Sequence, residues 1–246
     1  TPGKADAICY HDPIGEDTFY KTFKAALPPT LVATDPEPGQ RDVILYTPIV
    51  IDFDEDMQEV SIEVEGMLGD VEYTGNRGIY KPRSVYLPGK EYQVKVMGKS
   101  HLGESLPTYH FSFHTLDMED KYWVEINLRP IQKLVVYRGD KAIRTMVASG
   151  GLEDEDNATP LGYFLLKDRG ERFFTQRIQE GGLYWVRITG NWLIHSMPRN
   201  KDDEIIPEEL AKHGIPASHG CVRLKDQEAK WFYDNIPIGT PCYIHD

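Results

Sequence analysis

A thiol and a nearby imidazole in this chain have the types and spacing needed for acyl transfer. The thiol lies in the segment Ser218-His219-Gly220-Cys221-Val222-Arg223-Leu224, and His195 lies upstream in the run Ile194-His195-Ser196. A cysteine nucleophile needs a base for its proton and backbone N–H groups that stabilise the oxyanion formed on a carbonyl. Gly220 has no Cβ, so the main chain beside the thiol can turn sharply. The sequence therefore predicts a cysteine acyltransferase.

Each position of this motif can be given a role. We expect Cys221 to be the nucleophile and His195 to be the base that makes the thiolate or receives the thiol proton, because imidazole titrates close to working pH. The backbone N–H groups of Gly220 and Cys221, with that of His219, would form the oxyanion hole. The His219 side chain either positions the substrate or the thiol, or is structural.

Arg223 follows the thiol by two residues and offers a planar fork of N–H donors. It either holds a substrate carboxylate through paired hydrogen bonds or forms a buried salt bridge that shapes the loop. We expect three further residues to contact the substrate, namely Ser218, Tyr184 and Trp192.

Metal binding is a competing use of the same side chains. Four residues of ligand type could hold zinc, namely His195, His213, His219 and Cys221, but their spacing matches no recognised zinc pattern. Two acidic runs, at 52–56 and 153–156, could bind calcium. Both lack the glycine-containing loop of calcium sites, so we expect solvated turns there. The sequence predicts neither a metal nor a cofactor.

Several short motifs recur in order through the second half of the chain. They are Trp123-Val-Glu-Ile-Asn-Leu128, Leu134-Val-Val-Tyr137, Ala148-Ser-Gly150, Thr159-Pro-Leu-Gly-Tyr-Phe164, Tyr184-Trp-Val186, Trp192-Leu-Ile-His195, the motif at 218–224, Ile238-Gly-Thr240 and Cys242-Tyr-Ile244. In this order they resemble the L,D-transpeptidase catalytic family (YkuD-type), bacterial enzymes that cross-link peptidoglycan. The resemblance runs from about Tyr122 to the end of the sequence.

This resemblance implies a mechanism and a location. Cys221 would attack the carbonyl between the diamino acid at position three and the terminal D-alanine of a tetrapeptide stem, and D-alanine would leave. An amine of a neighbouring stem would then resolve the thioester into a 3→3 cross-link. The backbone carbonyl of Ser196 would fix the tautomer of His195. Carbapenem-type β-lactams would acylate the same thiol, and the enzyme would act in the periplasm or cell wall, its export signal or anchor having been removed.

The motif leaves the acyl acceptor open. With water as acceptor the same site is an L,D-carboxypeptidase, and with a protein lysine it is an anchoring enzyme. A different class of function is also conceivable, a cell-wall-binding or scaffolding module whose catalytic half is weak. The intact histidine, glycine and cysteine set argues against that reading.

The segment 196–217 is several residues longer than is usual in the family. Its extra length is rich in charge and includes one possible helical turn after Pro207. In the family this region forms a lid over the site, so it either contacts the substrate or is a solvated surface insertion.

Charge and cysteine content exclude several classes of protein. The chain has 246 residues and a net charge of −12, with the acidity mainly in its N-terminal half. Nucleic acids and anionic membranes are bound by clusters of Lys and Arg, and this acidic chain shows no such cluster, so neither is an expected partner. No apolar run is long enough to cross a bilayer. Cys9, Cys221 and Cys242 are too few and odd in number for a disulfide scaffold, and Cys242 is expected to be a buried small hydrophobe.

The pattern of apolar residues predicts a mostly β chain in three parts. Residues 1–29 form an extension with a short helix, since Phe19, Tyr20, Phe23, Ala26 and Leu27 have helical spacing. Period-two alternation and regular turns at 30–117 indicate an antiparallel β-sandwich that resembles bacterial immunoglobulin-like modules. Residues 118–246 form the β-rich catalytic domain with one or two short helices, one capped by Asp226 and ending before Pro237.

Overall fold

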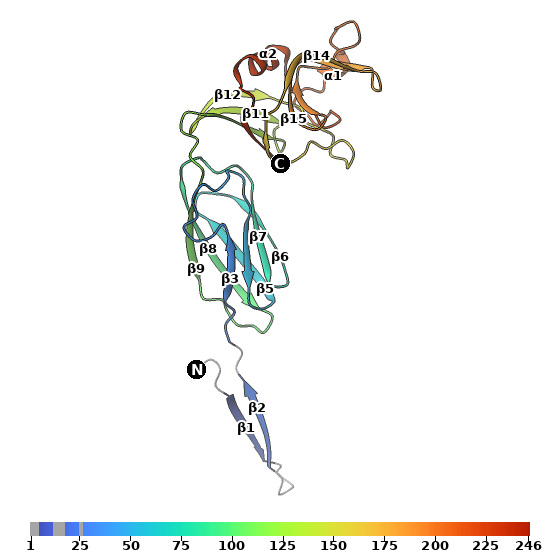
Figure 1. Ribbon diagram of the computed structural model, residues 1–246. Coiled ribbons are helices and arrows are strands. Elements are labelled where there is room, and N and C mark those ends of the chain that lie inside the picture. Colours follow the sequence, from blue (N-terminus) through green and yellow to red (C-terminus); the bar gives the residue numbers. More distant parts are fainter. Residues whose placement is uncertain (1–4, 12–17, 25–26) are drawn as a thin grey trace. The chain divides into compact units, whose positions relative to one another are not determined.

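The computed structural model describes residues 5–11, 18–24 and 27–246, with side chains from Leu27 onward. Its described residues form many strands and only short helices, so the prediction of a mostly β chain is confirmed. The chain divides into two compact units (Figure 1). One consists of Thr1–Arg41, Thr47–Pro82 and Glu91–Phe113, and the other of Asp42–Tyr46, Arg83–Lys90 and His114–Asp246. No helix of the described residues is long and apolar enough to span a membrane.

The N-terminal segment forms a β-hairpin, so the prediction of a helix there is wrong. Strand β1 (Ala5–His11) pairs antiparallel with β2 (Thr18–Lys24), which contains Phe19, Tyr20 and Phe23. Aromatic and β-branched residues favour strands once a partner strand is present, and the helical spacing of three aromatics did not outweigh this preference. Ala26 lies outside the described residues, and Leu27 follows the strand with an exposed side chain.

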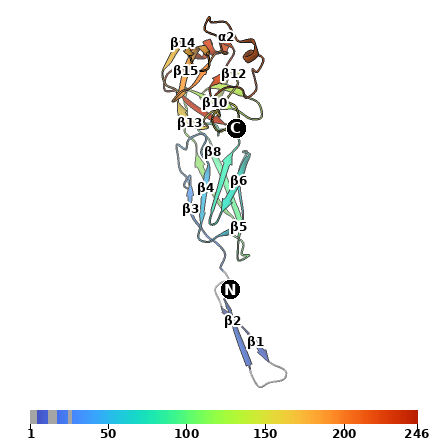
Figure 2. The ribbon, with the colours of Figure 1, turned by 90° about the vertical axis from the view of Figure 1, so that its right-hand side faces the viewer.

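Besides the β1–β2 hairpin, the first unit contains two antiparallel sheets (Figure 2). One has the order β3 (Leu31–Asp35), β4 (Ile49–Phe53), β7 (Arg77–Pro82), β6 (Gly69–Thr74), and the other the order β5 (Met57–Val64), β8 (Glu91–Ser100), β9 (Tyr109–His114). Alternate residues along β4 and β5 are buried. A Cβ on Gly78 would come 2.9 Å from Val60 of the other sheet, so the two sheets pack face to face. This arrangement is the predicted sandwich; its likeness to immunoglobulin modules stays a prediction.

The second unit is built from two further sheets. The five-stranded sheet has the order β12 (Lys141–Val147), β11 (Lys133–Arg138), β10 (Tyr122–Asn127), β18 (Pro241–His245), β13 (Gly162–Leu165). The four-stranded sheet has the order β14 (Arg169–Thr175), β15 (Glu180–Thr189), β16 (Trp192–His195), β17 (Val222–Arg223). One buried cluster joins both sheets, with Val124 and Val136 from the first and Val186 and Ile194 from the second.

Two helices complete this unit. Helix α1 (Pro207–Leu210) lies in the 196–217 segment, where a helical turn was predicted, and α2 (Asp226–Asn235) ends before Pro237 as expected. Asp226 is not the N-cap, which is Lys225; its carboxylate pairs with Arg199 instead. Helix α2 buries Ala229 and Phe232 in the core cluster.

The division of the chain differs from the contiguous domains predicted at 30–117 and 118–246. Two earlier segments belong to the second unit, because Leu45 and Val85 join Trp123 and Tyr243 in one buried cluster. Contacts between residues so far apart in sequence leave no local signal in the pattern of apolar residues.

Candidate active site

Parallel pairing of two short strands brings the predicted base and nucleophile together. In the register of β16 with β17, Ile194 is opposite Val222 and His195 is opposite Arg223. The chain turns at Gly220 and Cys221 immediately precedes β17, while His195 ends β16. Both side chains line one cavity of about 420 Å³.

The cavity contains most of the predicted site residues and several that were not predicted. The predicted ones are His195, Ser218, His219, Cys221 and Arg223. The residues that sequence analysis missed include Phe173, Arg177, Glu180, Arg187 and Asn191, which come from β14, β15 and their flanking turns. A second cavity of about 440 Å³ lies between the 196–217 segment and the start of α2, and none of the predicted catalytic side chains lines it.

His195 is a buried imidazole held in one orientation. Its side chain is 4 % exposed, and Nδ1 lies 2.6 Å from the Ser196 carbonyl oxygen, which can only accept a proton. Nε2 therefore carries the free lone pair of the neutral ring. The Phe173 ring packs edge-on at 5.0 Å between centroids, and a Cβ on Gly182 would come 2.7 Å from Nδ1. The site needs glycine at this position.

The charge state of His195 suits a general base. Burial, together with the charge of Arg223, lowers the pKa of His195 to about 3, and the hydrogen bond to Ser196 opposes this shift only in part. The ring is therefore neutral near pH 7.

Ser196 provides the carbonyl that orients His195, and this carbonyl is itself held in place. Its hydroxyl accepts the Leu183 N–H at 2.9 Å and donates to the Met197 carbonyl at 3.0 Å. Its own N–H donates to the Leu183 carbonyl at 3.0 Å. The carbonyl thus lies where the resemblance implied it would, beside Nδ1 of His195.

Cys221 is a neutral thiol in the resting site. Burial raises the pKa of Cys221, while the Leu193 N–H, which lies 3.4 Å from Sγ, and the charge of Arg223 act in the opposite direction. The thiol faces the Asn191 carbonyl oxygen at 3.7 Å. His195 is neutral as well, so the site rests as a thiol and a neutral imidazole.

Ser218 and Gly220 shape the turn that carries the thiol. The Ser218 hydroxyl accepts the Gly220 N–H at 3.0 Å and donates to the Cys221 carbonyl at 2.5 Å. Gly220 has φ +104°, and a Cβ there would lie 2.3 Å from Nε1 of Trp192. Only glycine fits this position.

This turn corrects two expectations. The Gly220 N–H is occupied by Ser218, so it is not free for an oxyanion. Within the described chain, the amides of His219 and Cys221 donate to no other residue and are the available pair. The Ser218 hydroxyl is likewise engaged within the turn, so it is a support of the motif and is not free for a substrate.

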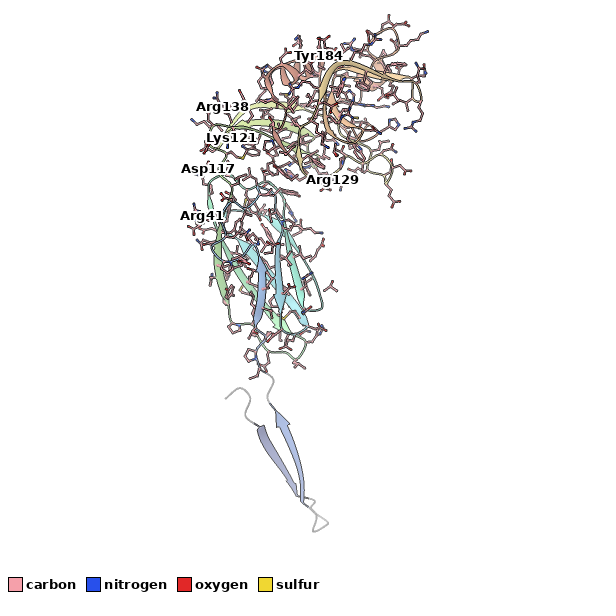
Figure 3. All side chains as sticks on the ribbon, viewed as in Figure 1. Arg41, Asp117, Lys121, Arg129, Arg138 and Tyr184 are labelled. Carbon is pink, nitrogen blue, oxygen red and sulfur yellow. The ribbon has the colours of Figure 1, made fainter. Side chains whose placement is uncertain are left out.

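Two aromatic residues expected to contact substrate do not line the cavity. Tyr184 points to the face covered by α2, where its ring lies 5.9 Å from that of Tyr233 and 5.3 Å from Nζ of Lys230 (Figure 3). Its backbone has φ +55°, which turns it out of the regular alternation of β15. Trp192 lies against Gly220 and is 37 % exposed. Tyr184 is therefore away from the thiol, and Trp192 is a neighbour of the turn.

Arg223 forms buried salt bridges, which is the second of the two roles that the sequence left open for it. Its Nη1 donates to Glu209 at 2.5 Å and to the Ala217 carbonyl at 3.3 Å, and Nη2 donates to Glu180 at 3.3 Å. The side chain is 4 % exposed. Sequence spacing gave no sign of Glu209 or Glu180, although a buried arginine requires carboxylates and 196–217 is rich in them.

The remaining cysteines and the zinc alternative can be placed as well. Cys242 is fully buried in β18, and burial raises its pKa far above the ordinary value. The side chain of Cys9 lies outside the described residues. No group of three or more His, Cys, Asp or Glu side chains in the described residues is arranged to hold a metal ion. His213, one of the proposed ligands, does not line the cavity.

Comparison with known proteins identifies the second unit. A family model, described as the L,D-transpeptidase catalytic domain (YkuD), matches residues 121–244. The chain belongs to this family. The Bacillus subtilis (strain 168) protein YciB, whose name assigns it to the L,D-transpeptidases, is 43 % identical over 133 residues, which cover 52 % of this chain and 68 % of that protein.

Solved L,D-transpeptidases are similar at lower identity. LdtMt1 in complex with imipenem is 20 % identical and covers 88 % of this chain and 99 % of its own, with a TM-score of 0.42. An L,D-transpeptidase from Mycobacterium smegmatis is 17 % identical, with 89 % and 100 % coverage and a TM-score of 0.41. L,D-transpeptidase 3 from Mycobacterium tuberculosis, in complex with a faropenem-derived adduct, is 19 % identical, with 88 % and 98 % coverage and a TM-score of 0.40.

The L,D-transpeptidase match includes every predicted site residue of the cavity. His195, Cys221 and Arg223 all lie inside 121–244, as do Glu180 and Glu209. Strands β3 to β9 lie outside the match.

Proposed function

We propose that this L,D-transpeptidase forms 3→3 cross-links in peptidoglycan through a thioester on Cys221. The observation that carries the proposal is the placement of Cys221 and His195 on one cavity, with Nδ1 of His195 bound to a carbonyl so that Nε2 is free to accept a proton. A base oriented in this way needs no carboxylate partner.

The first half-reaction makes the thioester and releases D-alanine. The Cys221 sulfur bonds to the carbonyl carbon between the third and fourth residues of a tetrapeptide stem while its proton passes to Nε2 of His195. The amides of Cys221 and His219 bind the oxyanion. When the tetrahedral intermediate collapses, the carbon–nitrogen bond breaks and the imidazolium returns the proton to the departing amine of D-alanine.

The second half-reaction makes the cross-link. An amine on the side chain of a neighbouring stem attacks the thioester carbonyl and loses a proton to His195. The carbon–sulfur bond breaks, and the proton passes to the departing sulfur of Cys221. If water attacks instead, the product is a shortened stem, the result expected of an L,D-carboxypeptidase.

The cavity also suggests how the anionic substrate is held. Three arginines line it, in a chain of net charge −12. Arg187 is paired with Asp168, and Arg223 with Glu209 and Glu180. Arg177 makes no hydrogen bond or ion pair within the described chain. We therefore assign Arg177, in place of Arg223, the role of binding a carboxylate of the stem peptide.

β-Lactams of the carbapenem type are expected to acylate the same thiol. Two of the similar structures hold β-lactam-derived compounds, imipenem in one and a faropenem-derived adduct in the other. A strained β-lactam amide presents the same kind of carbonyl to Cys221 as a stem peptide does. Because the substrate is a wall polymer, the enzyme acts outside the cytoplasm.

The decisive experiment uses purified disaccharide-tetrapeptide fragments and mass spectrometry of the products. We expect free D-alanine and a cross-linked dimer with the wild-type chain, and neither with Cys221→Ala. Tripeptide without dimer would make the enzyme a carboxypeptidase. Attachment of the stem to a protein lysine would make it an anchoring enzyme. Fragment binding with no turnover would overturn the proposal in favour of a wall-binding module.

A further inference from the structure

The buried guanidinium of Arg223 joins the catalytic cavity to the 196–217 segment. Its Nη1 donates to Oε2 of Glu209 at 2.5 Å, and Glu209 belongs to α1 in that segment. Both partners are shielded from water, with side chains 4 % and 13 % exposed. An ion pair in such surroundings is strongly coupled, because little solvent screens it.

The backbone of Arg223 is fixed independently of this pair. Its N–H donates to the Ser149 carbonyl at 2.8 Å, and its carbonyl accepts the Ser149 N–H at 3.0 Å. It also stands opposite His195 in the strand register. The carboxylates therefore decide where the guanidinium points, while the sheet holds the main chain.

Charged and titratable groups surround this guanidinium from every neighbouring element. Helix α1 and the turn after it provide Glu209 and Lys212, whose Nζ lies 2.6 Å from Oε1 of Glu209. Strand β15 provides Glu180. The other such groups on the cavity are Arg177, Arg187, His195, His219 and Cys221.

The charge of Arg223 acts on both members of the catalytic pair. It contributes to lowering the pKa of His195, and it opposes the rise that burial causes in the pKa of Cys221. Burial raises the pKa of Glu209, but hydrogen bonds from Lys212 and Arg223 outweigh it, so this carboxyl is ionised at neutral pH. The negatively charged carboxylate of Glu209 therefore contacts the Arg223 guanidinium, although Glu209 is not part of the cavity lining.

We propose that Glu209 is a positioning residue, through which the 196–217 segment orients Arg223 and limits the positive charge that faces Cys221 and His195. The proposal rests on the proposed role of Cys221 as nucleophile. It gives the charged segment a task at the site although Glu209 itself does not line the cavity.

A matched control lies one position away on the same helix. Glu208 is exposed and makes no ion pair or hydrogen bond within the described residues. Glu208→Gln and Glu209→Gln remove the same charge from α1, but only the second alters the environment of Arg223.

The experiment measures alkylation of Cys221 by iodoacetamide against pH in the full chain, with thermal unfolding to confirm folding. With Glu209→Gln the charge of Arg223 is less compensated, which favours the thiolate, so we expect the midpoint to move down by about half a pH unit. The alkylation rate at pH 7 then rises by about threefold. The alkylation midpoint of Glu208→Gln should equal that of wild type. Glu209→Asp keeps the negative charge, so its midpoint should lie close to the wild-type value.

Turnover of the stem peptide gives a second readout. We expect kcat to fall by about threefold or more in Glu209→Gln, because the same charge makes His195 a weaker base, while KM stays unchanged. Alkylation midpoints equal for Glu208→Gln and Glu209→Gln would overturn the proposal, as would slower alkylation with a lowered Tm. Neither outcome touches the proposed function, which is tested separately by the products formed from disaccharide-tetrapeptide fragments and by the activity of Cys221→Ala.

Discussion

The second unit contains two regions that each carry a histidine and a cysteine, and only one of them is suited to catalysis. At the cavity, His195 and Cys221 stand on the β16–β17 pair. In the five-stranded sheet, His245 and Cys242 lie on β18, both fully buried. Both histidines are buried, but Cys221 is partly exposed on the cavity whereas Cys242 is buried, and the partners of the two histidines differ.

The partners determine what each histidine can do. Nε2 of His245 lies 2.9 Å from Oε1 of Glu125, whose Oε2 accepts the Tyr137 hydroxyl at 2.8 Å. Burial raises the pKa of Glu125, but these hydrogen bonds outweigh it and keep the carboxyl ionised. His195 has instead a carbonyl on one side and the positive charge of Arg223 nearby, so it stays neutral with a free nitrogen. A carboxylate partner makes a structural pair, and a carbonyl partner leaves a base.

The largest contrast is expected between the two cysteines. Cys221→Ala should abolish D-alanine release and cross-linking while the protein stays folded, because no other side chain replaces the covalent catalyst. Cys242→Ala should keep kcat/KM and lose about 1 kcal/mol of unfolding free energy, since it only removes a sulfur from the core. Product analysis and chemical denaturation measure the two effects. If folded Cys221→Ala still released D-alanine or formed cross-links, Cys221 would be no more important for catalysis than Cys242.

The two histidines should separate activity from stability. His195→Gln should lower kcat by at least about a hundredfold with little change in Tm, because a general base is lost. His245→Gln should leave kcat unchanged but cost about 3–5 kcal/mol of unfolding free energy, because Glu125 would remain buried without its partner. Steady-state kinetics and urea unfolding test both. Full activity in His195→Gln across neutral pH would move the role of base to His219.

Acid should act on stability through His195. Between its unfolded pKa of 6.5 and its folded pKa of about 3, the unfolded chain binds a proton at this residue that the folded chain does not. The free energy of unfolding therefore falls as the pH drops through this window, by up to about 1.4 kcal/mol per pH unit from this group. His195→Gln should flatten the slope measured by urea unfolding. His101→Gln, at an exposed histidine, should not; equal slopes in both variants would contradict a neutral buried base.

The smallest effect is expected at the rim of the catalytic cavity. Arg177→Gln should raise KM for a stem peptide by about tenfold with kcat nearly unchanged, because a carboxylate contact made in both ground and transition states is lost. Arg138→Gln removes an equal charge on β11, where Arg138 pairs with Asp120, and should have no effect. Equal KM values in the two variants would show that Arg177 does not bind the substrate carboxylate.

Sequence reasoning was most successful where chemistry and local pattern coincide. The helix before Pro237 has its own apolar spacing, and the carbonyl of Ser196, which the family resemblance implied, lies beside Nδ1 of His195. It failed where a distant partner decides the outcome. The aromatics of β2 form a strand because β1 pairs with them, and Glu209 matters because the fold brings it to Arg223. The spacing of Tyr184 likewise gave no sign of its positive φ.

The position of β18 has a consequence for synthesis of the enzyme. This strand, the last along the sequence, lies between β10 and β13 and supplies the hydrogen-bonding partner for both. Pairings so distant in sequence form slowly. During translation the motif around Cys221 emerges before residues 241–245 do, so the five-stranded sheet cannot close until those residues have left the ribosome. Loss of those five residues would leave two unpaired strand edges, exposed to aggregation.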